Sequence, residues 1–207
     1  MARLLLIRHG RTNLQKEDRY WGSTDIPLSD EGVRQAEQIK DRLSKEKITH
    51  IYSSTLSRAR DTAKTTAKAQ HLAVTTCAEL NEFNFGYAEG LTYKEIEKLH
   101  PALAKQMASM GDISFPGGEN LSKFFIRTQS FLARLEKHKP QDVIAVFAHA
   151  GSLRMLVCHL LELEQKNWFK IFLDYASISI VYTYQNISII NTLNNTSHLK
   201  PRDADGS

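Results

Sequence analysis

The chain has 207 residues, which suits a single domain and is long enough to bury a sizeable core. Hydrophobic residues make up 42% of the chain and charged residues 24%, which excludes a disordered polymer and an integral membrane protein. The net charge of +4 comes from basic residues interleaved with acids, so it predicts no nucleic-acid surface and is compatible with a small anionic ligand.

The apolar run near the N-terminus is too short for a signal peptide, and no stretch approaches the length of a membrane-spanning helix. Only Cys77 and Cys158 are present, which predicts neither a disulfide framework nor a cysteine zinc site. We therefore expect a cytoplasmic protein without membrane or nucleic-acid partners, and the sequence leaves a homodimer open.

The first predicted element is a short strand over Leu4–Ile7, an apolar run that is typical of a strand buried on both faces of a parallel sheet. Arg8 and His9 follow it, and Gly10 permits a sharp turn. Because parallel sheets bind ligands beyond the carboxyl ends of their strands, His9 is a candidate ligand-facing residue. A lone histidine here is more often an ordinary boundary residue, so His9 needs support from other parts of the chain.

A polar loop over residues 13–25 comes next, and its aromatic residues Tyr20 and Trp21 are candidates to line a pocket. Residues 30–44 have apolar side chains at helical spacing, and residues 48–53 are predicted to form a second strand. A strand, a helix and a strand in this order favour a parallel, right-handed crossover.

The second strand leads into a predicted helix that continues to about Ala69. Arg58 falls in the first turn of this helix, where unpaired N–H groups and the positive end of the helix dipole favour an anion. Anion binding and an ordinary solvated surface position are about equally consistent with this placement of Arg58.

The remaining predicted elements follow in chain order. They are a short strand at Leu72–Thr76, an irregular acidic and aromatic segment at Glu79–Gly90, a helix after Thr92 that Pro101 interrupts or restarts, a turn at Pro116–Gly118, a helix at Asn120–Lys137, a strand at Val143–Ala148, a helix over Leu153–Leu161, and an antiparallel pair at Ser177–Tyr184 and Ile187–Leu193. We expect one domain over residues 1–194 and a disordered tail over residues 195–207.

The strand over residues 143–148 also runs directly into a histidine, His149, which small residues follow. Two strand ends therefore supply histidines, nearby segments supply arginines, and loops supply acids. Arginine provides a planar fork for phosphate oxygens, and a neutral imidazole can attack phosphorus to form a phosphohistidine. A carboxylic acid must then protonate the leaving alcohol. The pattern predicts phosphoryl transfer.

Four blocks of residues resemble the histidine phosphatase superfamily in its phosphoglycerate mutase-like branch. The blocks are Leu6–Thr12, Ser53–Ser54 with Arg58 and Thr62, Glu79–Glu82 with Gly86 and Glu89–Gly90, and His149 with Arg154. The resemblance spans about Arg3 to Leu193 and implies a three-layer α/β/α sandwich around a mostly parallel sheet, with no cofactor and no metal.

The resemblance also implies a role for each matching residue. His9 matches the nucleophile, Arg8 and Arg58 match the residues that hold the phosphate, and His149 matches a second catalytic histidine that contacts the transferred phosphoryl group. Glu82 matches the acid that protonates the leaving group. For Glu79 and Glu89 the resemblance implies structural rather than catalytic roles.

Two positions depart from the pattern of the family. Gln15 stands where many members have asparagine, and since glutamine can donate a similar hydrogen bond from a longer stem, Gln15 is a candidate phosphate-binding residue. Ala150 replaces the more common glycine after the second histidine, and we expect little effect.

A short segment separates the acidic loop from Gly117-Gly118-Glu119, whereas mutases of this branch carry a longer insertion there. A shorter lid excludes water less well, which favours hydrolysis. Together with Phe115–Glu119 and the His-Ala-Gly at 149–151, this resembles α-ribazole phosphatases and broad-specificity phosphomonoesterases. The expected substrate is a small phosphate ester, with α-ribazole 5′-phosphate a candidate.

Three alternatives stay open at this point. A phosphoglycerate mutase would need a bisphosphorylated primer. An inactive phospho-ligand binding module is disfavoured because His9, Glu82 and His149 are all present. A metal hydrolase built on the two histidines is weaker, because the sequence has no helical histidine pair at ligand spacing.

Overall fold

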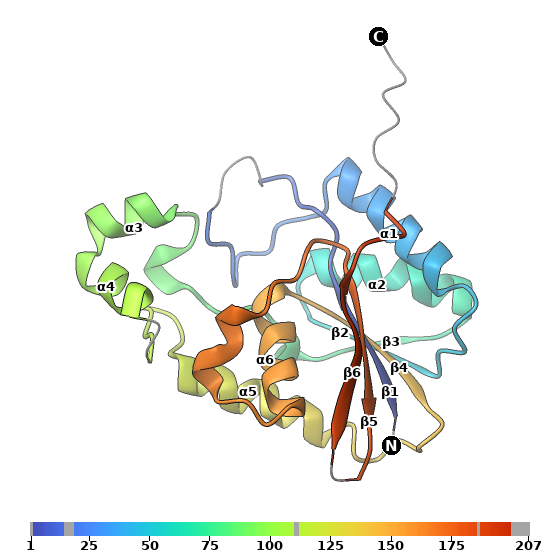
Figure 1. The fold of residues 1–207 in the computed structure, drawn as a ribbon. Helices are drawn as coiled ribbons and strands as arrows, with labels where there is room; N and C mark the ends of the chain where they lie inside the picture. Colours follow the sequence, from blue (N-terminus) through green and yellow to red (C-terminus); the bar gives the residue numbers. More distant parts are fainter. Residues whose placement is uncertain (1, 15–18, 110–111, 186, 200–207) are drawn as a thin grey trace.

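The computed structural model describes residues 2–14, 19–109, 112–185 and 187–199, which form a sheet with the strand order β3-β2-β4-β1-β5-β6 (Figure 1). The strands are β1 (Arg3–Arg8), β2 (His50–Ser53), β3 (Val74–Thr76), β4 (Val143–Ala148), β5 (Ile178–Thr183) and β6 (Ser188–Asn195). The neighbours among β3, β2, β4 and β1 pair in parallel, whereas β5 and β6 are antiparallel additions at one edge. The prediction of a mostly parallel sheet is confirmed.

Helices cover both faces of this sheet (Figure 1). The α-helices are α1 (Asp30–Leu43), α2 (Ser57–Gln70), α3 (Tyr93–Leu99), α4 (Pro101–Ser109), α5 (Leu121–Ala133) and α6 (Ala150–Leu160), and short 3-10 helices are η1 (Ala78–Leu80), η2 (Gly86–Ala88) and η3 (Gln165–Lys170). Helices α1 and α2 pack on one face, and α5 and α6 pack on the other. This is the predicted three-layer sandwich.

The apolar run of β1 explains why both faces are covered. Leu4 and Leu6 pack with α5 and α6, while Leu5 and Ile7 pack with α1 and α2, because successive side chains of a strand point to opposite faces. All four residues are at most 2% exposed. A strand buried in this way fixes the position of His9, which follows it.

The register of the central strands brings distant residues together. In the parallel pair of β1 and β4, Arg8 lies opposite Ala148, so His9 and His149 leave the sheet at the same level. The His9 backbone N–H donates to the carbonyl of Ala148 at 3.0 Å, which continues the pairing by one residue. The two histidines are adjacent because the strands end together.

A third apolar cluster lies beside the sandwich, beneath α3 and α4. Pro101 starts α4 directly after α3, which is the restart that the sequence indicated. Phe83 and Phe124 stack at the centre of the cluster, with ring centroids 4.6 Å apart. The cluster joins α3 and α4 to the layer that contains α5 and α6.

Several boundaries differ from the expectations, and two of the differences concern the end of α5 and the C-terminal end of the domain. Helix α5 ends at Ala133 rather than near Lys137. Beyond Ala133 the chain forms tighter turns, in one of which the Leu135 N–H donates to the Leu132 carbonyl. The expectation of a disordered tail from residue 195 is wrong for residues 195–199, because Asn195 ends β6 and Leu199 packs against the core. Residues 200–207 lie outside the described residues.

None of the helices in the described part of the chain combines the length and the apolar character that crossing a bilayer requires.

Candidate active site

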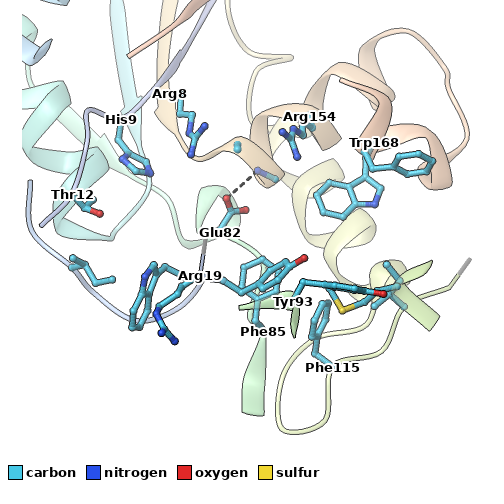
Figure 2. Close-up of a pocket in the computed structure, with 18 of the residues that line it drawn as sticks. Arg8, His9, Thr12, Arg19, Glu82, Phe85, Tyr93, Phe115, Arg154 and Trp168 are labelled. Carbon is cyan, nitrogen blue, oxygen red and sulfur yellow. Dashed lines mark hydrogen bonds between the residues drawn. The ribbon is translucent and has the colours of Figure 1, made fainter. Parts of the chain in front are cut away.

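The carboxyl ends of β1, β2 and β4 meet at one cavity of about 510 Å³ (Figure 2). Its polar end is formed by Arg8, His9, Arg58, Glu82 and Arg154, which come from the end of β1, the first turn of α2, the loop after η1, and α6. Arg58 is 2% exposed, which decides against a solvated surface position. The structure thus brings the residues of all four sequence blocks into one place.

One ring nitrogen of His9 is hydrogen-bonded, and the other is available. Its Nδ1 lies 2.7 Å from the carbonyl oxygen of Gly10, and since a carbonyl only accepts, Nδ1 carries the proton. The lone pair of Nε2 is then free. Burial, followed by the positive charges of Arg58 and Arg8, holds the pKa of His9 well below its ordinary value. His9 is therefore a neutral imidazole with an available nucleophilic nitrogen at neutral pH.

Arg58 is fixed by three hydrogen bonds. Its Nη1 and Nη2 donate to the carbonyls of Thr24 and Gly22, at 2.8 and 2.7 Å, and its Nε donates to Nδ1 of His149 at 3.2 Å. Two of its five N–H groups remain for a ligand. The guanidinium is oriented before any ligand binds, which reduces the entropy lost on binding.

His149 is fully buried, and both of its ring nitrogens are engaged. Because Nδ1 accepts from Arg58, Nε2 carries the proton and donates to Oγ of Ser54 at 2.8 Å, and Ser54 donates in turn to Oδ1 of Asn81 at 2.7 Å. Burial, then the charge of Arg58, holds the pKa of His149 well below its ordinary value.

This arrangement differs from the expectation that His149 contacts the phosphoryl group. Its ring lies 5.0 Å from the ring of His9, centroid to centroid, but His149 does not line the cavity. Direct contact would require the bond between His149 and Ser54 to be exchanged for one to the ligand. In the structure as it stands, His149 positions Arg58.

Arg8 and Arg154 supply further positive charge. Arg8 lies over the ring of Tyr175, with Cζ 3.5 Å from the ring centroid, and donates to the carbonyl of Leu173 at 2.6 Å. Within the described part of the chain, the Nε atoms of Arg8 and Arg154 are buried without a hydrogen-bond partner. Burial lowers the pKa of both side chains, from values so high that both stay charged. Buried donors of this kind call for an anion.

Glu82 lies opposite these arginines, on the loop after η1 (Figure 2). Its Oε1 accepts from the backbone N–H groups of Phe83 and Ser152, and its Oε2 accepts from that of Gly151 at 3.0 Å. The first turn of α6 therefore orients the carboxyl group. Among the described residues, Oε2 has a single protein donor, which leaves it able to exchange a proton with a ligand.

The close approach of Glu82 to α6 depends on Gly151. A Cβ atom at this position would lie 2.2 Å from Oε1 of Glu82, well inside van der Waals contact. The glycine in the His-Ala-Gly segment is therefore explained by the carboxyl group packed against it.

Two side chains outside the cavity hold its loops in place. Glu89 accepts from the backbone N–H groups of Gly22, Ser23 and Thr24, which fixes the loop whose carbonyls bind Arg58. Arg127 donates to the carbonyl of Glu82 at 3.2 Å. Glu89 is structural, as the sequence indicated, whereas nothing in the sequence marked Arg127.

The far end of the cavity is apolar (Figure 2). This apolar end is formed by Tyr93, Met107, Ile113, Phe115 and Trp168, which come from α3, α4, the segment after α4, and η3. Tyr20 and Trp21 also line the cavity, as expected for the loop that contains them. The cavity can therefore hold an anion at one end and an apolar group at the other.

Sequence reasoning missed several of these residues. Arg154 was part of a motif without a role, and neither Tyr175 nor Trp168 was singled out. Tyr175 contacts Arg8 across a long sequence separation, for which no local pattern exists. Gln15, the remaining candidate phosphate-binding residue, lies outside the described residues.

The chain is similar in sequence and in fold to known proteins. The family described as "Histidine phosphatase superfamily (branch 1)" matches residues 4–196. The chain is 39% identical to "Phosphoglycerate mutase-like protein 4" of Arabidopsis thaliana over 75% of this chain and 69% of that protein. It is 30% identical to "Phosphoserine phosphatase 1" of Hydrogenobacter thermophilus over 96% of this chain and 95% of that protein. A solved structure of a putative alpha-ribazole-5'-P phosphatase from Escherichia coli superposes with a TM-score of 0.86 at 26% identity, covering 94% of this chain and 98% of that one.

Proposed function

Because this chain belongs to the histidine phosphatase superfamily, branch 1, we propose that it hydrolyses small phosphate monoesters through a phosphohistidine on His9. The observation that carries the proposal is the arrangement of the polar end. A neutral imidazole with an available Nε2 lies among the guanidinium groups of three arginines, and a carboxyl group lies opposite them.

The first half of the reaction transfers the phosphoryl group. Arg8, Arg58 and Arg154 bind the phosphate oxygens and stabilise the charge of the transition state. Nε2 of His9 forms a bond to phosphorus as the bond to the alcohol oxygen breaks. The proton of Glu82 passes to that oxygen, so the alcohol leaves neutral.

The second half returns the enzyme to its starting state. Glu82, now a carboxylate, accepts a proton from water as the water oxygen attacks phosphorus. The bond between phosphorus and His9 breaks, inorganic phosphate is released, and Glu82 is protonated again. His149 takes part by holding Arg58 against the phosphate.

Trapping the intermediate tests this function. A radiolabelled phosphate ester should label the protein at His9, with the acid-labile and alkali-stable behaviour of phosphohistidine, and inorganic phosphate should appear at the same rate as the alcohol. His9→Gln should show neither label nor turnover. Ligand binding without turnover by the unmodified chain would instead indicate a binding module.

Catalysis by this site should not need a metal ion. The ring nitrogens of His149 are hydrogen-bonded to Arg58 and Ser54. The three guanidinium cations around His9 repel a metal cation. Turnover should therefore be unchanged by EDTA. Loss of activity with the chelator, restored by a divalent ion, would favour the metal-hydrolase alternative.

The apolar end supports a finer proposal about the substrate. An alcohol with an uncharged aromatic group would remove apolar surface of Tyr93, Phe115 and Trp168 from water, at about 25 cal/mol per Å². A phosphorylated amino acid would place charge there instead. We favour α-ribazole 5′-phosphate, whose benzimidazole ring has this character.

A substrate panel separates the candidates. We expect kcat/KM for α-ribazole 5′-phosphate to exceed that for phosphoserine by at least about tenfold. The reverse order would favour the activity named for the Hydrogenobacter relative. Isomerisation of 3-phosphoglycerate, seen in a coupled assay with a bisphosphorylated primer, would favour a mutase.

A further inference from the structure

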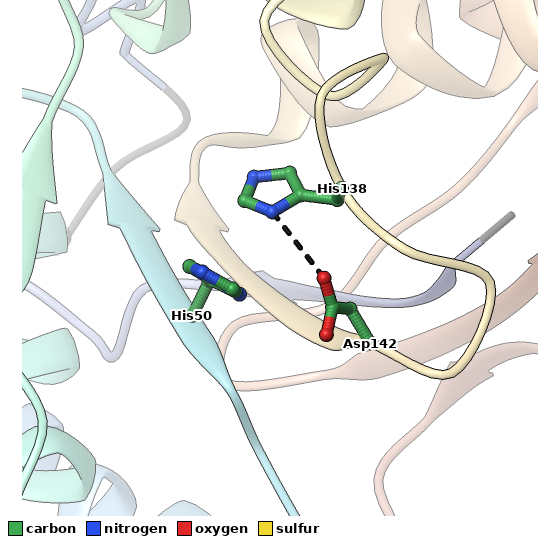
Figure 3. Close-up of side chains that lie close together, drawn as sticks. All are labelled: His50, His138 and Asp142. Carbon is green, nitrogen blue, oxygen red and sulfur yellow. Dashed lines mark ion pairs between the residues drawn. The ribbon is translucent and has the colours of Figure 1, made fainter.

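A second cluster of polar side chains lies at the amino ends of β2 and β4, away from the cavity (Figure 3). His50 is the first residue of β2, and His138 and Asp142 lie in the connection between α5 and β4. One candidate ligand atom from each side chain lies within 4.8 Å of the other two. The polar end of the cavity lies at the opposite edge of the sheet, beyond the carboxyl ends of the parallel strands, so the cluster has no place in the proposed reaction.

A hydrogen bond to Thr49 engages one ring nitrogen of His50. The hydroxyl oxygen of Thr49 lies 3.2 Å from the carbonyl of Val143, to which it can donate its one proton. Nδ1 of His50 lies 2.9 Å from the same oxygen, and the tautomer with the proton on Nδ1 donates to it. This leaves the lone pair of Nε2 free on an exposed side chain.

His138 is held in a comparable way. Its Nε2 lies 2.8 Å from the hydroxyl oxygen of Tyr52, and with Nε2 as the donor, Nδ1 keeps its lone pair on the side of Asp142. Metal-binding histidines almost always donate their other ring N–H to an oxygen atom in this way. Both histidines of the cluster have such a partner.

The distance between His138 and Asp142 also fits a shared ion. Nδ1 and Oδ2 are 3.6 Å apart, which is too long for a hydrogen bond. Two ligands of a tetrahedral zinc ion, each at about 2.0–2.1 Å from the metal, lie about 3.3–3.4 Å from each other. The backbone N–H of Lys139 donates to the same Oδ2 at 2.8 Å, which orients Asp142 and leaves a second lone pair of this oxygen for an ion.

We propose that His50, His138 and Asp142 bind a zinc ion, with water in the fourth position. Two imidazole nitrogens and one carboxylate oxygen are a donor set that zinc accepts, and the exposed His50 gives the ion a route from solvent. The ion would connect the start of β2 to the segment that leads into β4. It therefore acts on the stability of the sheet rather than on catalysis.

Zinc titration of the purified, untagged chain tests the proposal. Isothermal titration calorimetry should show one zinc ion bound per chain. At a hundredfold excess of zinc over the dissociation constant, the midpoint of thermal unfolding should rise by about 5 °C. His50→Gln and Asp142→Asn should each weaken zinc binding at least about tenfold, and Asp142→Asn still accepts the N–H of Lys139.

A matched control and an activity assay complete the test. His71→Asn replaces another exposed histidine, at the end of α2, and should bind zinc as the unmodified chain does. Without zinc, His50→Gln should retain full turnover of p-nitrophenyl phosphate, which shows that it folds. Unchanged zinc affinity in both His50→Gln and Asp142→Asn, or no zinc bound by the unmodified chain, would overturn the site.

Discussion

The two ends of the cavity are built differently. The side chains of the polar end lie at the end of β1, in the first turns of α2 and α6, and, for Glu82, on a loop held by the first turn of α6. Arg58 and Glu82 each make three hydrogen bonds to the protein. The side chains of the apolar end come from α3, α4, η3 and the segment after α4.

This difference separates the reaction from the choice of substrate. The polar end is held by the sheet, whose geometry is set by buried β1 and β4, so its groups are positioned before a ligand arrives. The apolar end belongs to a separate cluster beside the sandwich. Changes at the polar end should therefore affect turnover of every substrate, and changes at the apolar end should affect only some.

Replacing His9 should have the largest effect. His9→Gln removes the nucleophile, and we expect kcat to fall by at least about 10⁴-fold for all phosphate esters. Steady-state kinetics with α-ribazole 5′-phosphate and with p-nitrophenyl phosphate measure this loss. A variant that retains a tenth of the activity on either substrate would exclude His9 as the nucleophile.

Replacing Glu82 should have a smaller effect that depends on the leaving group. Glu82→Gln cannot protonate the alcohol, so we expect kcat/KM, which reports the first half of the reaction, to fall by about 10²- to 10⁴-fold for an alkyl phosphate. p-Nitrophenolate leaves without a proton, so kcat/KM of its ester should fall much less. Equal losses for the two substrates would show that Glu82 only maintains the structure of the site.

Gly151→Ala should reproduce part of this behaviour without removing the acid. The new Cβ would meet Oε1 of Glu82 at 2.2 Å, so the carboxyl group must turn away, while alanine suits the helix better than glycine does. We expect kcat for alkyl phosphates to fall roughly 10- to 100-fold, with little change in the unfolding midpoint. Ala150→Gly, one residue earlier, is the control. Full activity of Gly151→Ala would mean that the position of Glu82 is not critical.

The two ends also differ in how far the sequence predicts them. His9, Arg58 and His149 could be placed because each follows a recognisable strand, and parallel strands bring their carboxyl ends to one edge. His9 and His149 are neighbours because β1 and β4 are adjacent in the sheet. The order of the strands along the sequence does not specify this adjacency. The hydrogen bonds of His149 to Arg58 and Ser54 join residues far apart in the chain, so no sequence pattern predicts them.

No local pattern marks the apolar end. Tyr93 and Trp168 lie in a helix and a 3-10 helix whose positions depend on contacts with Phe83 and the rest of the third cluster. An aromatic residue in such a segment looks the same whether it packs in a core or lines a cavity. The substrate, for this reason, could be predicted only by resemblance.

Tyr93→Ala should change selectivity at the apolar end. Loss of the ring removes apolar contact, and we expect kcat/KM for α-ribazole 5′-phosphate to fall about tenfold while that for glycerol phosphate stays the same. Tyr87→Ala is the control, because Tyr87 is exposed and does not line the cavity. An equal fall for both substrates would indicate that Tyr93 supports the polar end instead.

The pH dependence of stability should produce the smallest effect, and of the two ends of the cavity only the polar end contains a histidine. The folded-state pKa of His9 is held below its unfolded value near 6.5, so the unfolded chain binds a proton that the folded chain does not. The stability from neutral His9 is therefore present above pH 6.5 and is lost as the pH falls toward the folded-state pKa. Between pH 7.5 and 5.5 the loss should be about 1 kcal/mol in the free energy of unfolding.

Urea unfolding of the unmodified chain and of His9→Asn at these two pH values isolates this contribution. Asparagine does not titrate, so the free energy of unfolding should fall by about 1 kcal/mol less in the variant than in the unmodified chain. Tyr93→Ala, at the apolar end, should keep the full pH dependence. If His9→Asn loses as much stability as the unmodified chain, His9 is not held neutral by its surroundings, and the free Nε2 on which the proposed reaction depends must be explained in another way.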